Sequence, residues 1–547
     1  MPPRQAHELD SYLPETPYKD YLYTNFVPSD DECSRIRDLV GLATEELAKT
    51  TEGLEKTSDG SQDSLDSTAR KRDQLQELID SHLALVSGAR RLPHDVLEEI
   101  FMACLAPNTY SSMKATQSPL VLSQICSGWR RSAISMCRLW ASLSIQRNFR
   151  KFNATTSQHK RDVVGATMEK VTAWLTRSRN LPLAISFSTA SHSIFRTILE
   201  CSRRWEHIRF VVIPSHIALL ARLSPADVPL LRTAVIKGLD ESNLDSWSFL
   251  CAPNIRALSL RGFRFKSQVP LLTGTLVQLS LTSTSLAHAL AALRQCPNLE
   301  TCNLENISDG TVGVLSGTPI HLERMERLCV VGLNSTHLFH CIDMPNLRTL
   351  QYGGGSDLLL PTPTVWCTPD KVEEIGLSAE ISTTALSGLL SEFPMLQNLL
   401  LHYPRKSLST KTKSCKLFKV LTPQPKSAKE ILCPHLQNIC SLGFNVGSDE
   451  ELLALIDARQ TTKGIQPLSS VHIAFMRGRS ADILLRLPPA LTVDLRYPTR
   501  GEFREIRRGR GFQDPPELRR RRQACDVDWA LISGGWLEWG RETEKRF

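Results

Sequence analysis

A short apolar phrase recurs nine times between Trp205 and Leu401, and it constrains the fold more than any other feature of the sequence. Each phrase has apolar residues at positions i, i+3 and i+5, as at Ile255, Leu258 and Leu260. Successive phrases begin 21 to 26 residues apart. Apolar residues two apart are typical of a strand with one buried face. A single phrase cannot bury that face alone, so neighbouring copies must stack.

A period of 20–29 residues with this spacing is the signature of leucine-rich repeats. We therefore expect an α/β fold in which residues 165–497 form an irregular horseshoe-shaped solenoid. The i+3 and i+5 residues would point inward, and alternate residues would line the concave face. Helical pieces such as 286–293 and 384–390 would form the outer wall. A helix at 168–179 and a strand at 181–187 would start the stack.

The repeat pattern changes near the end of the predicted solenoid. Residues 404–428 are rich in Lys, Ser, Thr and Pro, which predicts an inserted loop. Further strands are expected near 471–473 and 491–495. Residues 498–547 form an Arg-rich tail. A run of four arginines at 519–522 allows either a nuclear-import signal or a solvated charged segment, and the second is the simpler interpretation.

Residues 1–88 have a different pattern. Residues 1–30 are rich in Pro, Tyr and Asp, which predicts an extended arm. Apolar residues at helical spacing follow at Ile36, Val40 and Leu47, and again at Leu75 and Leu85, with a Ser-, Asp- and Gly-rich break between them. Residues 31–88 are therefore predicted to form a helical hairpin or a short coiled coil. A dimerisation coiled coil is the alternative, but the heptads are few.

Residues 89–145 contain two predicted amphipathic helices. The first follows Pro93, whose missing N–H suits a helix start, and carries Asp95 near the positive end of the helix dipole. The second is predicted from Pro119, with Val121 and Trp129 on its apolar side. Two helices this short bury little surface by themselves, so their apolar faces need a partner.

The phrases Leu92-Pro93-His94-Asp95-Val96-Leu97, Ile125-Cys126-Ser127-Gly128-Trp129-Arg130 and Leu139-Trp140 occur in the order found in an F-box, and this segment resembles one. The resemblance implies docking to the Skp-type adaptor of a cullin ubiquitin ligase. The residues that would make this contact are Leu92, Pro93, Val96, Leu97, Ile100, Phe101, Leu122, Ile125, Cys126, Trp129, Leu139 and Trp140. The loop 106–118 is longer than in a compact F-box, and Gly128 falls inside the second predicted helix.

The order of parts resembles a large group of F-box proteins with C-terminal leucine-rich repeats from mushroom-forming fungi. Thr24-Asn25-Phe26-Val27-Pro28 and Trp174-Leu175-Thr176-Arg177-Ser178 carry this likeness together with the F-box phrases. The likeness is good over residues 20–215 and only architectural beyond them. It implies an adaptor-binding domain followed by a solenoid, and it names no target protein.

Composition narrows the remaining function classes. The net charge is +8, and residues 499–522 contribute +5 of it, so the rest is nearly neutral and unlike a nucleic-acid-binding surface. The 15 cysteines are scattered and lack a Cys-x-x-Cys pair, which predicts reduced, mostly buried thiols. No apolar stretch is long enough for a membrane span, and no apolar run follows the first residues. We expect a cytoplasmic or nuclear protein.

No catalytic, cofactor or metal motif is apparent. The sequence has no phosphate-binding loop, no His-Glu-x-x-His and no Gly-x-Ser-x-Gly. The F-box resemblance, together with this absence, implies a non-catalytic substrate-recognition subunit of an SCF-type ubiquitin ligase. Such a subunit binds the adaptor, through it a cullin, and an unknown target protein on the repeats. The alternative is a leucine-rich scaffold whose F-box acts outside a ligase.

Overall fold

The computed structural model divides the chain into two compact units. The first ends at Trp140 and the second begins at Ala141, except that Tyr110 groups with the second. It describes residues 16–56, 62–105, 110–146, 157–244, 247–265, 274–307, 318–332, 336–353, 361–378, 381–402, 416–423, 431–442, 446–475 and 478–497. The predicted tail 498–547 lies outside these residues, as do residues 1–15 of the predicted arm. Within the described residues, no helix combines the length and the apolar character needed to cross a membrane.

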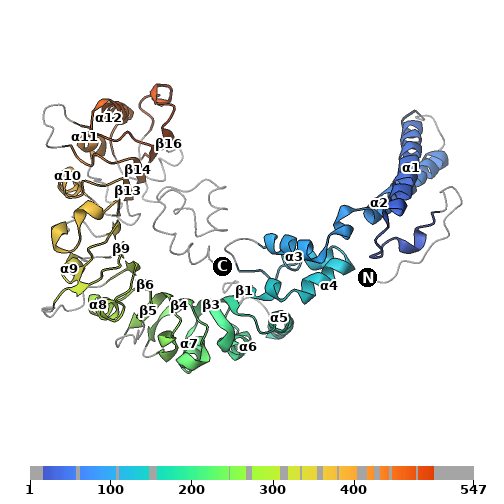
Figure 1. Cartoon of the computed structure of the whole chain (residues 1–547), viewed down its shortest axis with the longest axis horizontal. Helices are drawn as coiled ribbons and strands as arrows, with labels where there is room; N and C mark the ends of the chain where they lie inside the picture. The colour runs from blue at the N-terminus through green and yellow to red at the C-terminus, as the bar shows by residue number, and fades with distance from the viewer. Residues whose placement is uncertain are drawn as a thin grey trace. The chain divides into compact units, whose positions relative to one another are not determined.

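The first unit begins with a hairpin of two long helices, α1 (Asp30–Lys56) and α2 (Gln62–Leu85) (Figure 1). The facing sides of the two helices share one apolar core. This core contains Tyr18, Ile36, Val40, Ala43, Leu75, Leu78, Ile79 and Leu85. His82 is fully buried beside it, with Nδ1 2.7 Å from the Leu78 carbonyl oxygen and Nε2 2.7 Å from the Thr16 hydroxyl. Residues predicted at helical spacing thus meet across the hairpin.

The described part of the N-terminal arm is fastened to the helices. It contains a short 3-10 turn, η1 (Lys19–Tyr21), rather than a fully extended chain. The Arg90 guanidinium donates to the backbone oxygens of Thr24 (2.8 Å) and Phe26 (3.2 Å). The rest of the unit consists of η2 (Gly88–Arg91), α3 (His94–Ala103), η3 (Leu122–Gln124), α4 (Ser127–Ser135) and η4 (Cys137–Trp140).

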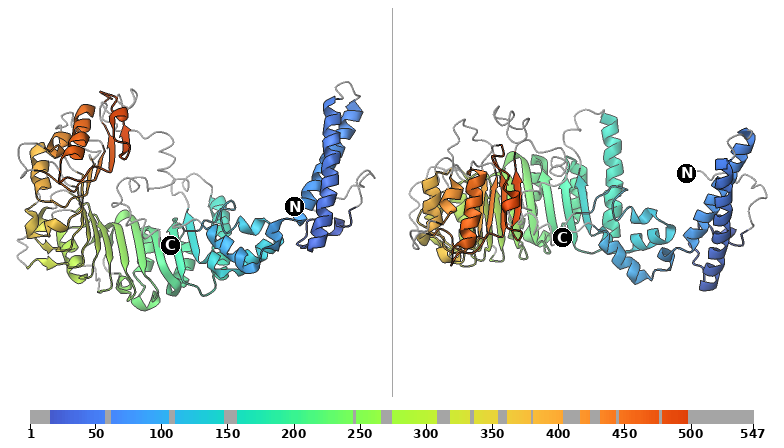
Figure 2. Two further views of the ribbon diagram at one scale, coloured as in Figure 1. Left: turned by 45° about the horizontal axis from the view of Figure 1, so that its top comes forward. Right: turned by 90° about the horizontal axis from the view of Figure 1, so that it is seen from above.

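The second unit is built on one open sheet of 14 parallel strands, which confirms the mixed α/β class (Figure 2). The strands follow the chain order, and each pairs with its neighbours in the sequence. They are β1 (Ser142–Gln146), β2 (Leu183–Ser188), β3 (Trp205–Val212), β4 (Thr233–Leu244), β5 (Ala257–Phe265), β6 (Gln278–Thr282), β7 (Thr301–Glu305), β9 (Arg327–Val331), β11 (Thr349–Gly353), β12 (Glu374–Leu377), β13 (Asn398–His402), β14 (Asn438–Leu442), β15 (Ser470–Ala474) and β16 (Thr492–Arg496).

Helices connect many of these strands and cover one face of the sheet (Figure 1). They are α5 (Ser157–Arg177), α6 (His192–Glu200), α7 (Pro214–Leu220), α8 (Leu286–Gln295), α9 (Thr336–Phe339), α10 (Thr383–Ser391), α11 (Leu417–Leu421) and α12 (Asp449–Thr461). Short 3-10 turns replace a helix in other connections: η6 (Ser202–Arg204), η7 (Pro225–Asp227), η8 (Ser248–Cys251), η9 (Pro363–Val365), η10 (Pro369–Lys371) and η11 (Leu484–Arg486). The two-residue strands β8 (Ile320–His321) and β10 (Ile342–Asp343) pair beside the main sheet.

The core of the second unit is formed by side chains that pair in register across the sheet. The first row contains Leu143, Ile185, Ile208, Ala234, Leu258, Leu279, Cys302, Leu328, Leu350, Ile375, Leu399, Ile439, Val471 and Val493. The second row lies two residues further along each strand. The i+3 and i+5 positions of all nine phrases fall in these two rows, and most of their side chains are fully buried.

The proline-containing turns before the strands have a bonding role that the sequence pattern did not reveal. The side-chain amide of Asn254 donates to the Pro229 carbonyl oxygen at 2.8 Å, and that of Asn298 donates to the Gly274 carbonyl at 2.5 Å. Asn346 repeats this bond to the Glu323 carbonyl at 2.8 Å. Each asparagine therefore ties its turn to the equivalent turn one repeat earlier.

Two expectations about the boundaries of the repeats were wrong. The sheet begins at β1, whose residues 142–145 were assigned to the preceding domain, and the Trp174 indole N–H donates to the Ser142 carbonyl at 3.1 Å. The predicted loop 404–428 contains α11, because Leu417, Phe418 and Leu421 are apolar at helical spacing and are buried. Residues 404–415 and 424–428 of that loop lie outside the described residues.

The longest strands, β4 and β5, pass each other at a pair of glycines. The register of their pairing shifts after Lys237. A Cβ atom on Gly262 would lie 2.6 Å from the Gly238 carbonyl oxygen, and Gly262 has a φ of +71°. Both the close approach and the left-handed backbone exclude a larger residue here. This bulge lets the two strands continue beyond the regular sheet.

Replacing Gly262 tests whether this position requires a glycine. We expect Gly262→Ala to lower the free energy of unfolding by roughly 1–3 kcal/mol, because alanine is strained at this φ and collides with the backbone. Urea unfolding provides the measurement. Gly388→Ala in α10 is the control. Nothing lies within 4 Å of its added Cβ, so we expect it to stabilise by about 0.5–1 kcal/mol. Equal changes in the free energy of unfolding for the two variants would contradict the requirement for glycine at position 262.

A second buried feature, His216 in α7, lies among aromatic rings. It stacks on Phe195 with centroids 4.4 Å apart and packs edge-on against Phe187 at 5.4 Å. Both ring nitrogens are buried without a hydrogen-bond partner. Burial, with a smaller contribution from the nearby His192, lowers the pKa of His216 to about 4. The neutral imidazole is therefore the folded form.

The stability of the second unit should consequently fall with acidification. Below its ordinary pKa of 6.5, His216 takes up a proton in the unfolded chain but not in the folded one, until the pH reaches about 4. This linkage amounts to at most about 3 kcal/mol between those pH values. We expect His216→Leu to remove this part of the loss in a comparison of urea midpoints at pH 7.5 and 5. An unchanged pH dependence would contradict the assignment.

Candidate functional site

The predicted adaptor-binding segment folds as short helices that pack on one another. α3 begins after Pro93, which is its N-cap, and the Leu97 N–H donates to the Pro93 carbonyl at 3.0 Å. Asp95 lies in the first turn, where it complements the helix dipole. Phe101 is fully buried, and its ring meets the Trp129 ring edge-on with centroids 5.1 Å apart. This contact joins α3 to α4.

The second predicted helix is interrupted, which corrects the expectation that it runs on from Pro119. A turn leads into η3, and α4 starts only at Ser127. Cys126 has an extended backbone, and its sulfur accepts the Trp129 N–H at 3.4 Å as an N-cap. The Arg130 Nε donates to the Ser123 carbonyl at 2.8 Å and so occupies an oxygen that a continuous helix would bond internally.

Gly128 lies in the first turn of α4. The nearest atoms to a Cβ added there belong to Asn25 and Cys126, at an ordinary contact distance of 3.7 Å. The Asn25 side-chain amide donates to the Ser127 hydroxyl. The N-terminal arm therefore packs against the start of α4, a contact that the sequence did not suggest.

The twelve predicted contact residues divide into three groups by exposure. Five are buried: Leu97, Phe101, Leu122, Leu139 and Trp140. Leu92, Ile100, Cys126 and Trp129 are half-buried. Three are exposed: Pro93, Val96 and Ile125, with Val96 at 42% and Ile125 at 56%. The Trp140 indole N–H donates to the Ala133 carbonyl at 2.8 Å, which shows a structural role for this end of the segment. Helical periodicity did not distinguish these groups.

Sequence reasoning missed two residues of this segment. Ile134 in α4 is 40% exposed, and Met136 is only 6% exposed. Ile134 follows Arg130 and Arg131 by one helical turn, and an apolar residue on this charged side of the helix is the signal that could have identified it. Val96, Ile125 and Ile134 are thus the exposed branched aliphatic residues of this segment among the residues described.

A second candidate surface is the face of the sheet opposite the helices. Its central row, in register from β1 to β16, contains Ser144, Ser186, Arg209, Val235, Ser259, Ser280, Asn303, Cys329, Gln351, Gly376, Leu400, Cys440, His472 and Asp494. The hydroxyls of Ser259 and Ser280 are buried without a hydrogen-bond partner. Nine of these fourteen residues are buried. Arg209 is exposed, and the half-buried members are Val235, Cys329, His472 and Asp494.

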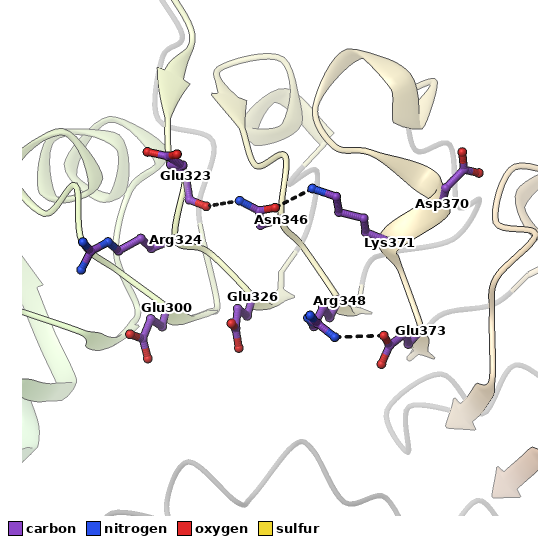
Figure 3. A pocket seen from close by; sticks show the side chains of 9 residues that line it. All are labelled: Glu300, Glu323, Arg324, Glu326, Asn346, Arg348, Asp370, Lys371 and Glu373. Atoms are coloured by element: carbon purple, nitrogen blue, oxygen red, sulfur yellow. Dashed lines mark hydrogen bonds and ion pairs between the residues drawn. The ribbon is translucent and has the colours of Figure 1, made fainter.

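A groove of about 680 Å³ runs along the edge of the sheet where β7, β9, β11 and β12 begin (Figure 3). Its side chains come from successive turns and are almost all charged. Lys371 donates to the Asn346 side-chain oxygen at 2.6 Å, and Arg348 pairs with Glu373 at 3.1 Å. Glu300 and Glu326 lie side by side at its lower edge. The exposed Arg348–Glu373 ion pair contributes little to stability, and the groove is a polar rim of the sheet.

The 13 described cysteines are free thiols; six are buried, six are half-buried and Cys104 is exposed. Burial raises the pKa of Cys296 to about 12 and raises that of Cys302 further. Such thiols are poor nucleophiles and poor metal ligands at neutral pH. No group of three or more His, Cys, Asp or Glu side chains is placed to hold a metal ion within the residues described.

No protein-family model matches the sequence, and no curated protein matches it. The geometry of the two candidate surfaces is therefore the basis for assigning a function.

The division of the segment 92–140 into core and surface can be tested by stability. We expect Phe101→Ala to lower the free energy of unfolding of the first unit by about 3–5 kcal/mol, because it leaves a large cavity. Ile125→Ala should change it by less than about 1 kcal/mol, because that side chain is mostly in water. Thermal unfolding of the two variants measures the difference, and similar losses would refute the division.

Proposed function

We propose that this protein is a substrate-recognition subunit of an SCF-type cullin ubiquitin ligase. Residues 89–140 would act as the F-box that binds a Skp-type adaptor. The second unit would be a leucine-rich-repeat solenoid that binds a target protein. This role needs no catalytic residue in the chain, because the subunit only brings a target close to the ubiquitin-conjugating enzyme.

One observation carries the adaptor-binding part of the proposal. The three F-box-like phrases fold together, and their buried residues form a core that leaves Val96 and Ile125 in water. Exposed apolar side chains favour a protein partner. Val96 is 42% and Ile125 56% exposed, so complete burial on binding would contribute roughly 1 kcal/mol for each. The half-buried Leu92, Ile100 and Trp129 would add to that contact.

The repeat unit supports the target-binding part. Its apolar rows are mostly buried by its own helices and turns. The opposite face of the sheet exposes Arg209 and, in part, His472 and Asp494, and stacked repeats commonly bind proteins along such extended faces. The leucine-rich spacing and the parallel strands in chain order agree with this assignment. The target itself is left open, and a cytoplasmic or nuclear location fits the proposal.

Adaptor binding can be tested with variants that the fold tolerates. We expect a Val96→Asp/Ile125→Asp double variant to bind a purified fungal Skp-type adaptor at least about 100-fold more weakly, because each charge would be buried at the interface. Leu42→Asp is the matched control, since Leu42 is 70% exposed on α1, outside the F-box-like phrases. Calorimetry measures the affinity, and unchanged thermal unfolding shows that each variant is folded.

The outcomes separate three possibilities. Equal adaptor affinity of the double variant and the wild type, or no binding by either, would overturn the adaptor assignment. Adaptor binding followed by co-purification of a cullin would support the ligase role. Adaptor binding without a cullin would instead favour a scaffold that uses the F-box outside a ligase.

A further inference from the structure

A buried carboxylate holds the C-terminal end of the sheet together. Asp449, the first residue of α12, is fully buried. Its Oδ2 atom accepts hydrogen bonds from the Ser480 N–H (2.7 Å), the Ser480 hydroxyl (2.6 Å) and the Ala481 N–H (3.1 Å). Its Oδ1 atom accepts one from the Tyr497 hydroxyl at 2.6 Å. Four donors thus satisfy one buried charge, which is the condition for keeping it ionised.

These bonds connect three segments that are distant in sequence. Tyr497 directly follows β16, and its ring stacks on Phe475 with centroids 5.0 Å apart. Phe475 follows β15 and donates its N–H to the Arg496 carbonyl at 2.9 Å. β16 has a described strand neighbour on one side only, and Val493 and Leu495 are half-buried there. Asp449 and its donors Ser480, Ala481 and Tyr497 form a hydrogen-bonded cluster. This cluster compensates for part of the burial that inner strands obtain from a second neighbour.

Ser480 is the solvent-exposed member of this hydrogen-bonded cluster. Residues 478–480 are exposed and belong to no helix or strand. Arginine stands one and three positions before the serine, at Arg479 and Arg477. Kinases that select basic substrates recognise such a charge pattern. The Arg479 guanidinium is already paired with Asp482, so it is engaged within the loop.

We propose that Ser480 is a phosphorylation site whose modification releases the end of the sheet. A basic-directed serine kinase would transfer the γ-phosphoryl group of ATP to Oγ. The new O–P bond replaces the bond between the β- and γ-phosphates, ADP leaves, and the hydroxyl proton passes to the base of the kinase. The proposal concerns the repeat unit alone and does not depend on adaptor binding.

The consequence follows from charge. Phosphorylation removes the hydroxyl donor and adds a charge of about −1.5 to −2 at neutral pH. That charge would lie beside the buried Asp449 carboxylate, and the Glu450 carboxylate is only 3.5 Å from Oγ. Repulsion between these anions favours a state in which the loop leaves Asp449. The carboxylate would then be rehydrated, and Tyr497 and β16 would lose their tie to α12.

Phosphorylation of the full chain in vitro tests the site. The protein is incubated with ATP and the catalytic subunit of a basic-directed kinase, and modified residues are mapped by mass spectrometry. A peptide of residues 473–484 shows whether the kinase accepts this sequence. We expect both to be modified at Ser480, and Ser480→Ala to remove the signal. Modification of the peptide but not of the folded chain would overturn the proposal.

Hydrogen exchange tests the structural effect. In the phosphorylated chain we expect amides of residues 478–497 to exchange at least about tenfold faster, while those of β11 to β13 are unchanged, because opening is confined to the end of the sheet. Ser480→Glu should reproduce part of this change, and Ser391→Glu on exposed α10 should not. In Asp449→Asn the effect of phosphorylation should shrink, because one of the repelling charges is gone. Unchanged exchange after full modification, or the same change in Asp449→Asn, would refute the mechanism.

Discussion

The structure of the second unit depends on rows of apolar side chains that lie in register across parallel strands. One repeat supplies only two or three of these side chains, and it buries them only when the strand before and the strand after are in place. The spacing of i+3 and i+5 puts both on the same side of every strand. Loops between the strands can therefore vary in length and structure, as the helices and 3-10 turns show, provided that the strands keep their register.

Polar contacts strengthen this stack where apolar burial is incomplete. The asparagines at 254, 298 and 346 bond backward to the preceding turn, and they lie at the rim where the strands begin. At the last strand the buried Asp449 joins a helix, a loop and Tyr497. A row of side chains that ends at an edge lacks half of its neighbours, so the terminal repeat needs such bonds more than a central one does.

In the first unit the same apolar phrases serve two purposes. Phe101 and Trp140 form the interior, and Val96 and Ile125 lie on the surface. Helical periodicity places Val96, Phe101 and Ile125 alike on apolar faces. It cannot say which face meets the protein itself and which meets a partner, because both need the same residue types. The helix break at Cys126 decides which residues are exposed. It ends the preceding turn before α4 starts, and Ile125 remains exposed to solvent.

The sequence alone determined the repeat period, the strands at the nine phrases, the α/β class and the helices near 36–47 and 75–85, because these follow from local spacing of apolar residues. It did not determine where the sheet begins, that α11 forms within 404–428, or that Gly238 and Gly262 meet. Those features depend on contacts between segments far apart in the chain. Tertiary packing also decided which of the residues 92–140 remain exposed, because burial is a property of neighbours and not of the residue itself.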